Sequence, residues 1–326
     1  MGEKCTVGER SFRFRPVTTD LWENNKRCTF CDRRACTITG DTMRQYVGAV
    51  WWFLFVIFSA ACEHTPESAR KELGQLGVAY SPHAFITSLT NNDLVTVQLF
   101  LKAGMDPNTT SAQGIPALLI ATMNCDGKLR EDKKTHADIA KALIVHGANV
   151  NVAHELHPPQ LVPFGSKHWT PLSLATRLEC HDLMQQLLQR GANMNRVDES
   201  GETVLMDSAS RNLNESVRIL LNAGVEIEAR AKATGNSALL FAAIEGHTNI
   251  VQMLLDRNAN IDARNNNGES ALMLAAARGR PDVVRLLLQR GADISVKDKF
   301  ENTALHNAEK HGGPEVTQLL QSAGAR

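Results

Sequence analysis

Two clusters of histidine, glutamate and cysteine in this chain have residue types that could bind zinc. His154, Glu155 and His157 form the first cluster, the segment HELH. The zinc motif HExxH places two histidines four residues apart on one helix, with the glutamate as general base. Here the histidines are three apart, and Pro158-Pro159 would end a helix at once. This spacing favours a polar loop.

The second cluster, CTFCDRRAC, contains Cys28, Cys31 and Cys36. A structural zinc site needs four ligands, and no second ligand pair accompanies this irregular spacing. The phosphate-binding patterns GxGxxG and GxxxxGK and the nucleophile pattern GxSxG are absent from the sequence. We therefore expect no enzyme activity, no catalytic residue, no metal, no cofactor and no small-molecule substrate.

The charge balance argues against a nucleic-acid partner. The 326 residues include 35 basic and 35 acidic side chains, so the formal net charge is zero. Nucleic-acid-binding proteins carry a basic excess or a basic stripe. Aromatic residues make up only 5% of the chain, which predicts stacked small helices rather than an aromatic core.

The most apolar segment runs from Met43 to Cys62 and predicts export or membrane attachment. Its uncharged part, Val47–Cys62, would rise only ~24 Å as a helix, less than the roughly 30 Å of a bilayer core. Arg44, the apolar run and Ser59-Ala60-Ala61 match the three regions of a signal peptide. We expect residues 1–42 to be disordered or a mis-assigned start, 43–62 a signal peptide or anchor, 63–78 a linker and 79–326 the folded part.

The segment SAAC, which ends at Cys62, resembles the lipobox of bacterial lipoproteins, although that family prefers Leu where Ser59 stands. The resemblance implies a lipid on the Cys62 thiol. It also implies the periplasmic face of the outer membrane, since Glu63 replaces the Asp that favours the inner membrane. An uncleaved single-pass inner-membrane anchor and a plain secreted protein remain alternatives. Basic residues precede the segment, so each alternative puts the rest of the chain outside the cytoplasm.

An internal repeat predicts the fold of the remaining chain. A helix end followed by a glycine or asparagine turn recurs at Gly104, Gly147, Gly191, Gly224, Asn258, Gly291 and Gly324. The intervals are 43, 44, 33, 34, 33 and 33 residues, so inserts of 10 or 11 residues lengthen the first two. Ser81-Pro82 and Thr170-Pro171 predict N-caps at helix starts. ALLFAAIEGH predicts a short first helix, and NIVQMLLDR predicts an amphipathic second helix.

These units resemble the ankyrin repeat family over about 80–326, in seven units. The resemblance implies an all-α solenoid of helix–turn–helix units with short β-hairpin turns, preceded here by the N-terminal hydrophobic helix. It also implies that His247 and His306 bond turn backbone. His168 and Glu301 stand where the family has a turn glycine, so we expect the hairpins before units three and seven to be distorted.

Cys125 and Cys180 fall in equivalent places in units two and three. Stacked units lie about 10 Å apart, whereas a disulfide needs Cα atoms within roughly 7 Å. The insert that starts at Asn124 could close this gap. A disulfide and two buried thiols are both compatible with the sequence.

The family contacts its partners through a concave face of hairpin tips and first helices. Mapped by position, the side chains expected there are Glu199, Glu202, Thr234, Asn236, Glu245, Asn266, Asn267, Glu269, Arg278, Lys299, Phe300 and Asn302. Phe300 has no core to enter at a hairpin tip, so it either anchors a partner or packs on unit six. The inserts Asn124–Thr135 and His154–Lys167 are further candidates.

The expected function is a non-catalytic, membrane-tethered scaffold that binds another protein outside the cytoplasm. The alternative is an accessory, inhibitor or immunity protein for a periplasmic enzyme or toxin, with the inserts near units two and three blocking the site of the partner.

Overall fold

The computed structural model describes residues 65–125, 133–155 and 168–325, and this part of the chain forms an all-helical solenoid. The described residues do not include the hydrophobic segment 43–62, which ends at Cys62. They also leave out most of the two inserts, Asn124–Thr135 and His154–Lys167. No described helix is both apolar enough and long enough to cross a bilayer.

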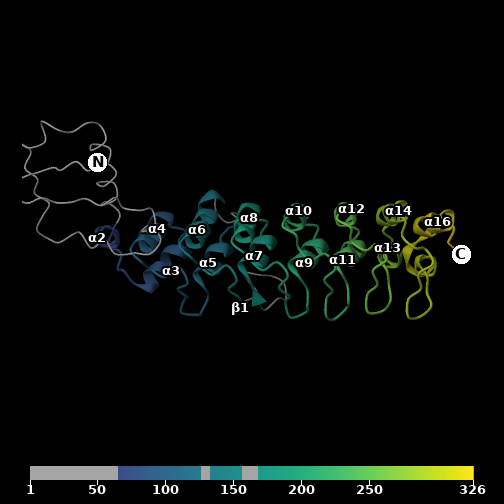
Figure 1. Ribbon diagram of the computed structural model, residues 1–326, viewed down its shortest axis with the longest axis horizontal. Coiled ribbons are helices and arrows are strands. Elements are labelled where there is room, and N and C mark those ends of the chain that lie inside the picture. Colours follow the sequence, from purple (N-terminus) through teal and green to yellow (C-terminus); the bar gives the residue numbers. More distant parts are fainter. Residues whose placement is uncertain (1–64, 126–132, 156–167, 326) are drawn as a thin grey trace, which may run out of the picture. The chain divides into compact units, whose positions relative to one another are not determined.

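Seven helix–turn–helix units follow one another in the described residues, as the repeat predicts (Figure 1). The first helices are α3 (Pro82–Thr90), α5 (Ala117–Met123), α7 (Pro171–Arg177), α9 (Val204–Ser210), α11 (Ala238–Glu245), α13 (Ala271–Ala277) and α15 (Ala304–Asn307), which continues as the π-helical turn η2 (Ala308–Gly312). The second helices are α4 (Leu94–Lys102), α6 (Lys133–Val145), α8 (His181–Gln189), α10 (Asn214–Asn222), α12 (Thr248–Asp256), α14 (Pro281–Gln289) and α16 (Pro314–Ser322).

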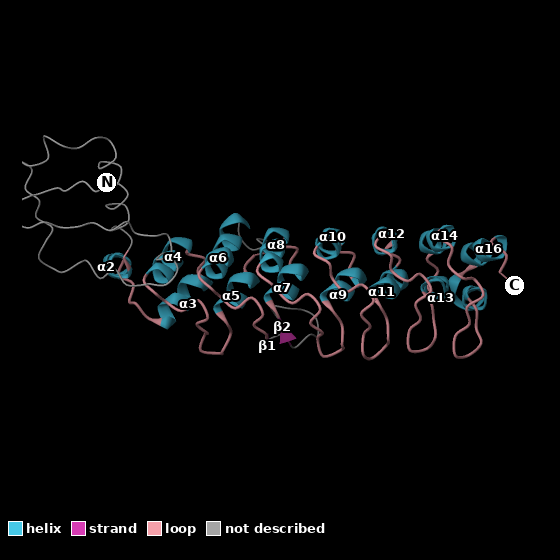
Figure 2. Cartoon of the chain, viewed as in Figure 1, coloured by secondary structure: helices cyan, strands magenta, loops and turns pink. Residues whose placement is uncertain are grey.

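Each helix packs against its counterpart in the next unit. Figure 2 shows the second helices in one row and the first helices in another, with the loops between units projecting beyond the first helices. Alanines such as Ala242, Ala243, Ala275 and Ala276 are fully buried between first helices. Their small side chains let these helices approach closely, so the apolar core extends along the array mainly through small and aliphatic side chains, with Phe85 and Phe100 buried in unit one.

The helix boundaries follow the capping signals of the sequence. Ser81 and Thr170 accept hydrogen bonds from the backbone N–H groups of Ala84 and Ser173, which confirms both predicted N-caps. Asn258 ends the turn after α12 with φ 62°, a left-handed conformation that asparagine adopts more easily than most residues. Asn258 therefore replaces the glycine of the other units without breaking the repeat.

The segment 63–78, expected to be a linker, contains a helix. Thr65 caps α2 (Pro66–Gln75), and Ala69 and Leu73 on this helix are buried against the core. α2 packs on α4, and Arg70 donates a hydrogen bond to the carbonyl of Ala103 at 3.2 Å. α2 therefore covers the second helix of unit one, on the side where the described residues contain no further unit.

A ladder of side-chain oxygens joins the turns that follow the second helices. Asn108 Oδ1 accepts from the backbone N–H of Asn149 at 2.8 Å, and Asn151 Oδ1 accepts from Asn193 N–H at 2.7 Å. The same bond recurs further along between Asn195 and Glu226, between Glu228 and Asn260, and between Asp262 and Asp293. After five of the turns, the polar residue four positions beyond the turn glycine or asparagine thus binds the backbone of the next unit.

The hairpin loops between units are held by a second recurring contact. Asp198 Oδ1 accepts from the N–H groups of Ser200 and Glu202, both at 2.9 Å. Asn265 makes the equivalent bonds before unit six, and Asp298 makes them before unit seven. A side chain inside each of these loops therefore fixes its conformation, as in Asx-turns.

Of the two hairpins expected to be distorted, the one before unit seven keeps its turn, and the connection of the one before unit three lies outside the described residues. Glu301 adopts φ 64°, and its N–H bonds the carbonyl of Asp298. At the equivalent Gly235, an added Cβ would lie 2.7 Å from the Asn266 backbone nitrogen of the next hairpin. In the part of the chain that the structure describes, no further hairpin packs on this one, so a side chain fits there. Before unit three, β1 (His154–Glu155) pairs antiparallel with β2 (His168–Trp169).

Cys125 and Cys180 form a disulfide in the structure, with their Cα atoms 6.2 Å apart. Cys125 follows α5, and Cys180 precedes α8, so the bond joins units two and three. This Cα separation lies within the usual range for a disulfide, and it is shorter than the spacing expected for stacked units.

The contact between hairpins predicts unequal costs for two glycine substitutions. Gly235→Ala should lower the free energy of unfolding by about 2–4 kcal/mol, because the new methyl group meets the next hairpin and the residue keeps φ +73°. Gly224→Ala is the matched control, with φ +81° and no atom within 4 Å of the added Cβ, and should cost about 1 kcal/mol. Urea unfolding measures both. Equal losses would contradict the close contact between hairpins.

Candidate functional site: the hairpin face

The hairpin loops and first helices form one surface of the array, here called the hairpin face. Its larger hollow is a groove of about 450 Å³ between units five and six. Six side chains predicted to bind a partner line it, namely Thr234, Asn236, Asn266, Asn267, Glu269 and Arg278. The groove therefore gathers half of the predicted contact residues, from positions more than 40 apart in the sequence.

The rim of the groove is a network of amides and one carboxylate. Asn265 Nδ2 donates to Asn236 Oδ1 at 3.1 Å and to Glu269 Oε2 at 2.8 Å. Asn236 is only 6% exposed, so it holds the rim together and offers little surface of its own. Asn266 and Asn267 are exposed on the tip of the hairpin and can form hydrogen bonds with a partner.

The inner part of the groove is apolar, and two charged side chains without an ion pair in the described residues lie on or directly after the same helices. Ile244, Leu274 and Ala277 are half-buried and line its inner wall. Arg278 lines the groove as well and is exposed, and Glu245 is exposed on α11. Neither side chain forms an ion pair with another described residue.

The hairpin before unit seven presents an aromatic ring. Phe300 is 76% exposed, so in the described part of the chain it is not covered by unit six. Lys299 beside it is exposed, whereas the side chain of Asn302 bonds Asp298 at 3.0 Å. Burial opposes ionisation of Asp298, but hydrogen bonds from Asn302 and Phe300 keep its pKa below the ordinary value. The charged Asp298 thus fixes the loop that carries Phe300.

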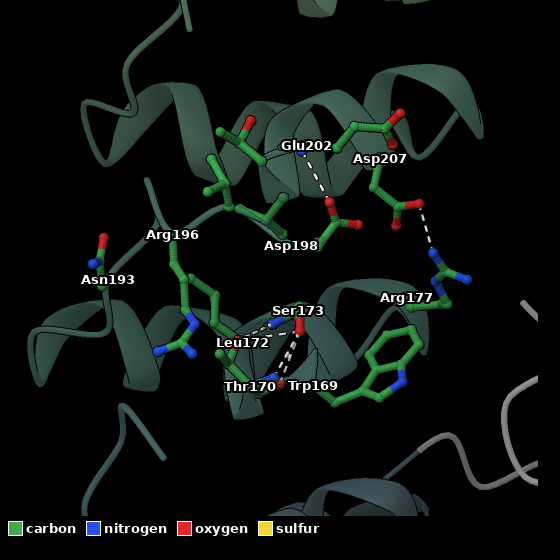
Figure 3. Close-up of a pocket in the computed structure, with 13 residues that line it drawn as sticks. Trp169, Thr170, Leu172, Ser173, Arg177, Asn193, Arg196, Asp198, Glu202 and Asp207 are labelled. Atoms are coloured by element: carbon green, nitrogen blue, oxygen red, sulfur yellow. Dashed lines mark hydrogen bonds and ion pairs between the residues drawn. The ribbon is translucent and has the colours of Figure 1, made fainter. Parts of the chain in front are cut away.

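A smaller pocket of about 50 Å³ lies between units three and four. Figure 3 shows Trp169, Thr170 and Ser173 on one side of it and Asp198, Glu202 and Asp207 on the other. Arg196 also lines the pocket, with an exposed side chain.

Arg177 joins the two units beside this pocket. Its guanidinium lies 4.8 Å from the centre of the Trp169 ring, and its Nη2 contacts Asp207 Oδ1 at 2.6 Å. Burial lowers the pKa of Arg177, and Asp207 partly opposes this. Nε and Nη1 of Arg177 are buried without a hydrogen-bond partner among the described residues, where the contacts of the guanidinium are with Trp169 and Asp207.

Glu202 is the least compensated charge of the pocket. Burial is the largest cause that raises the pKa of its carboxyl, and the negative charges of Asp198 and Asp207 raise it further. The positive charges of Arg211 and Arg177 lower this pKa, but by less. Its backbone N–H bonds Asp198, but no described residue donates a hydrogen bond to its carboxylate.

A family model described as ankyrin repeats, in three copies, matches residues 83–198, 132–231, 228–298 and 260–326, which together span most of the chain. The chain belongs to the ankyrin repeat family. Ankyrin repeats are generally non-catalytic interaction modules, so membership indicates a protein–protein interaction scaffold.

Three curated ankyrin proteins illustrate the similarity. The chain is 37% identical over 100 residues to the ankyrin repeat and KH domain-containing protein mask of Drosophila melanogaster, across 30% of this chain and 2% of that protein. It is 30% identical over 146 residues to the putative ankyrin repeat protein L91 of Acanthamoeba polyphaga mimivirus, across 40% and 21%. It is 32% identical over 109 residues to human ankyrin repeat and SOCS box protein 6, across 30% and 23%. The matches span under a quarter of each relative.

The other predicted residues of the ankyrin array do not line the groove. Glu202 lines the smaller pocket with Asp198, and the neighbouring Glu199 is exposed on the same hairpin. The sequence reasoning missed Trp169, Arg177 and Asp207 as a group. These three residues meet because the first helices of units three and four stack on each other. Two features of the sequence could have indicated the group: a tryptophan next to the Thr170 N-cap, and opposite charges on successive first helices.

The histidines of the array have different surroundings. His247 Nε2 lies 3.1 Å from the carbonyl of Ser210, which confirms its predicted contact with turn backbone. His154 and Glu155 lie in strand β1, not on a helix, and His157 lies outside the described residues. Among the described residues, no group of three or more His, Cys, Asp or Glu side chains is arranged to hold a metal ion.

Proposed function

We propose that this ankyrin array is a non-catalytic scaffold that captures a partner protein on its hairpin face. The partner would insert an apolar side chain into the groove between units five and six and pack against Phe300. In the same proposal, the segment 43–62 attaches the array to a membrane, with Cys62 lipidated and the array outside the cytoplasm, at the periplasmic face of an outer membrane.

The observation that carries the capture proposal is the exposed Phe300. A phenylalanine that is 76% exposed costs free energy in water, and burying a ring of this size in an interface stabilises a complex by roughly 1.5–3 kcal/mol. Aromatic residues surrounded by polar groups are frequent binding anchors. Arg278, Asn266 and Asn267 supply such polar groups beside the groove.

The disulfide between Cys125 and Cys180 supports the proposed location. Structural disulfides persist in secreted and periplasmic proteins and are rare in the reducing cytosol. The apolar run with its preceding Arg44 and the SAAC segment support export from the sequence side. An uncleaved inner-membrane anchor would give the array the same side of the membrane.

Capture should depend on Phe300 more than on apolar residues elsewhere on the surface. Phe300→Ala should weaken binding of the partner by roughly tenfold or more, because the substitution removes the ring that the partner buries. Val145→Ala is the control, since Val145 is 65% exposed on the second helix α6. Quantitative capture from an extract of the organism that encodes the chain, with both variants beside the wild type, measures the difference.

Arg278→Ala and Asn267→Ala should also weaken capture of the same partner, while the unfolding temperature stays within a few degrees of the wild type. If the captured protein binds all three variants as tightly as the wild type, the hairpin face is not the binding surface.

Lipid attachment should depend on a single cysteine. Cells that express the full chain with radiolabelled palmitate should yield a labelled protein, and Cys62→Ser should abolish the label and release the array from the membrane fraction. Cys36→Ser, upstream of the apolar run, should keep the label. A Cys62→Ser protein that stays in the membrane fraction would favour the uncleaved anchor, and an unlabelled wild type would exclude the lipoprotein.

A further inference from the structure

The pocket between units three and four holds a carboxylate that the described residues leave without a hydrogen-bond donor. Glu202 is half-buried there, with Asp198 and Asp207 as the neighbours that disfavour its ionised form most (Figure 3). A buried charge without a partner costs free energy, so a group supplied from outside could lower that cost.

The other carboxylates of the pocket already have partners. Asp207 accepts from Arg177 at 2.6 Å and from Arg211 at 2.8 Å, so two guanidinium groups share its charge. Asp198 accepts from two backbone N–H groups of its own hairpin. Glu202 is therefore the carboxylate of the pocket to which no described residue donates a hydrogen bond.

Among the described residues that line the pocket, Arg196 is the cation that is not bonded to Asp207. It lines the same pocket, but its side chain is exposed and makes no ion pair with a described residue. The cations that lower the pKa of the Glu202 carboxyl are Arg211 and Arg177, and both form ion pairs with Asp207.

The size of the pocket selects the kind of group that fits. A volume of about 50 Å³ holds a few water molecules, and therefore the tip of one side chain, but not a whole small ligand. An ammonium group is a compact charge with three rotatable donors, whereas a guanidinium is planar and wider. Thr170 Oγ1 lines the wall opposite Glu202 and accepts from the Ser173 N–H, which leaves one lone pair for a further hydrogen bond. Ser173 Oγ already accepts from the N–H and the hydroxyl of Thr170.

We propose that this pocket accepts the ammonium tip of a lysine side chain on the partner protein, with Glu202 as its counterion. The inference rests on the proposed function, since it names the chemistry that the hairpin face recognises. A lysine here would lie several units away from the groove and from Phe300, so it would fix the register of the partner along the array.

The test measures the pKa of the Glu202 carboxyl by NMR on the full chain in detergent micelles, with carbon-13-labelled glutamate. The probe is n-butylammonium chloride, which is the lysine side chain as a free molecule, at about 0.2 M, and the reference is sodium chloride at equal concentration. An ammonium in the pocket stabilises the ionised carboxylate, so the proton affinity of Glu202 should fall about threefold relative to sodium chloride.

Glu226 gives the matched internal control, because it is an exposed carboxylate of the same unit with no side-chain bond in the described structure. Its proton affinity should be the same in the two salts. The Glu202→Gln variant assigns the Glu202 resonance, and Glu226→Gln assigns that of the control.

Three outcomes would overturn the proposal. Equal shifts of Glu202 and Glu226 would show that no ammonium enters the pocket. A larger shift with guanidinium chloride than with n-butylammonium chloride would assign the pocket to arginine. A pKa of Glu202 below the ordinary value in sodium chloride would show that Arg196 already neutralises it. Since no partner protein is present, the result is independent of capture through the groove and Phe300.

Discussion

The contact between neighbouring units is the constraint on which the array depends. Each unit has a short Ala-rich helix and an amphipathic helix, and it cannot bury its apolar face alone. The next unit covers that face, and a side-chain oxygen such as Asn195 Oδ1 accepts a hydrogen bond from a backbone N–H in the turn after the second helix of that unit, here Glu226. At the N-terminal end α2 takes the place of a covering unit through Ala69 and Leu73.

The same constraint determines where binding sites can form. The hairpins must approach closely, which requires glycine where an added Cβ would meet the next loop, as at Gly235. Side chains inside the loops, such as Asp198 and Asn265, are used to hold the turns, so the exposed tips remain for a partner. Hollows form between units, and both the groove and the Glu202 pocket are lined from two units.

The sequence predicted the features that repeat and missed those that do not. The turn positions, the caps at Ser81 and Thr170 and the seven helix pairs follow from local spacing. Helix α2 has no unit of its own, so no period indicated it. Asn236 was predicted to face a partner, but Asn265 of the next unit covers it. Trp169, Arg177 and Asp207 meet only because unit three stacks on unit four, and a position-by-position alignment does not show such contacts.

Amide hydrogen exchange of the wild type and of Asn195→Ala tests the dependence on neighbouring units most directly. The substitution removes the acceptor of the Glu226 N–H without altering a buried apolar residue. The account predicts roughly tenfold faster exchange at Glu226 and throughout α8 and α10 on both sides of that contact, with little change in α16, the helix farthest along the array. Faster exchange confined to Glu226 itself, with α8 and α10 unchanged, would contradict it.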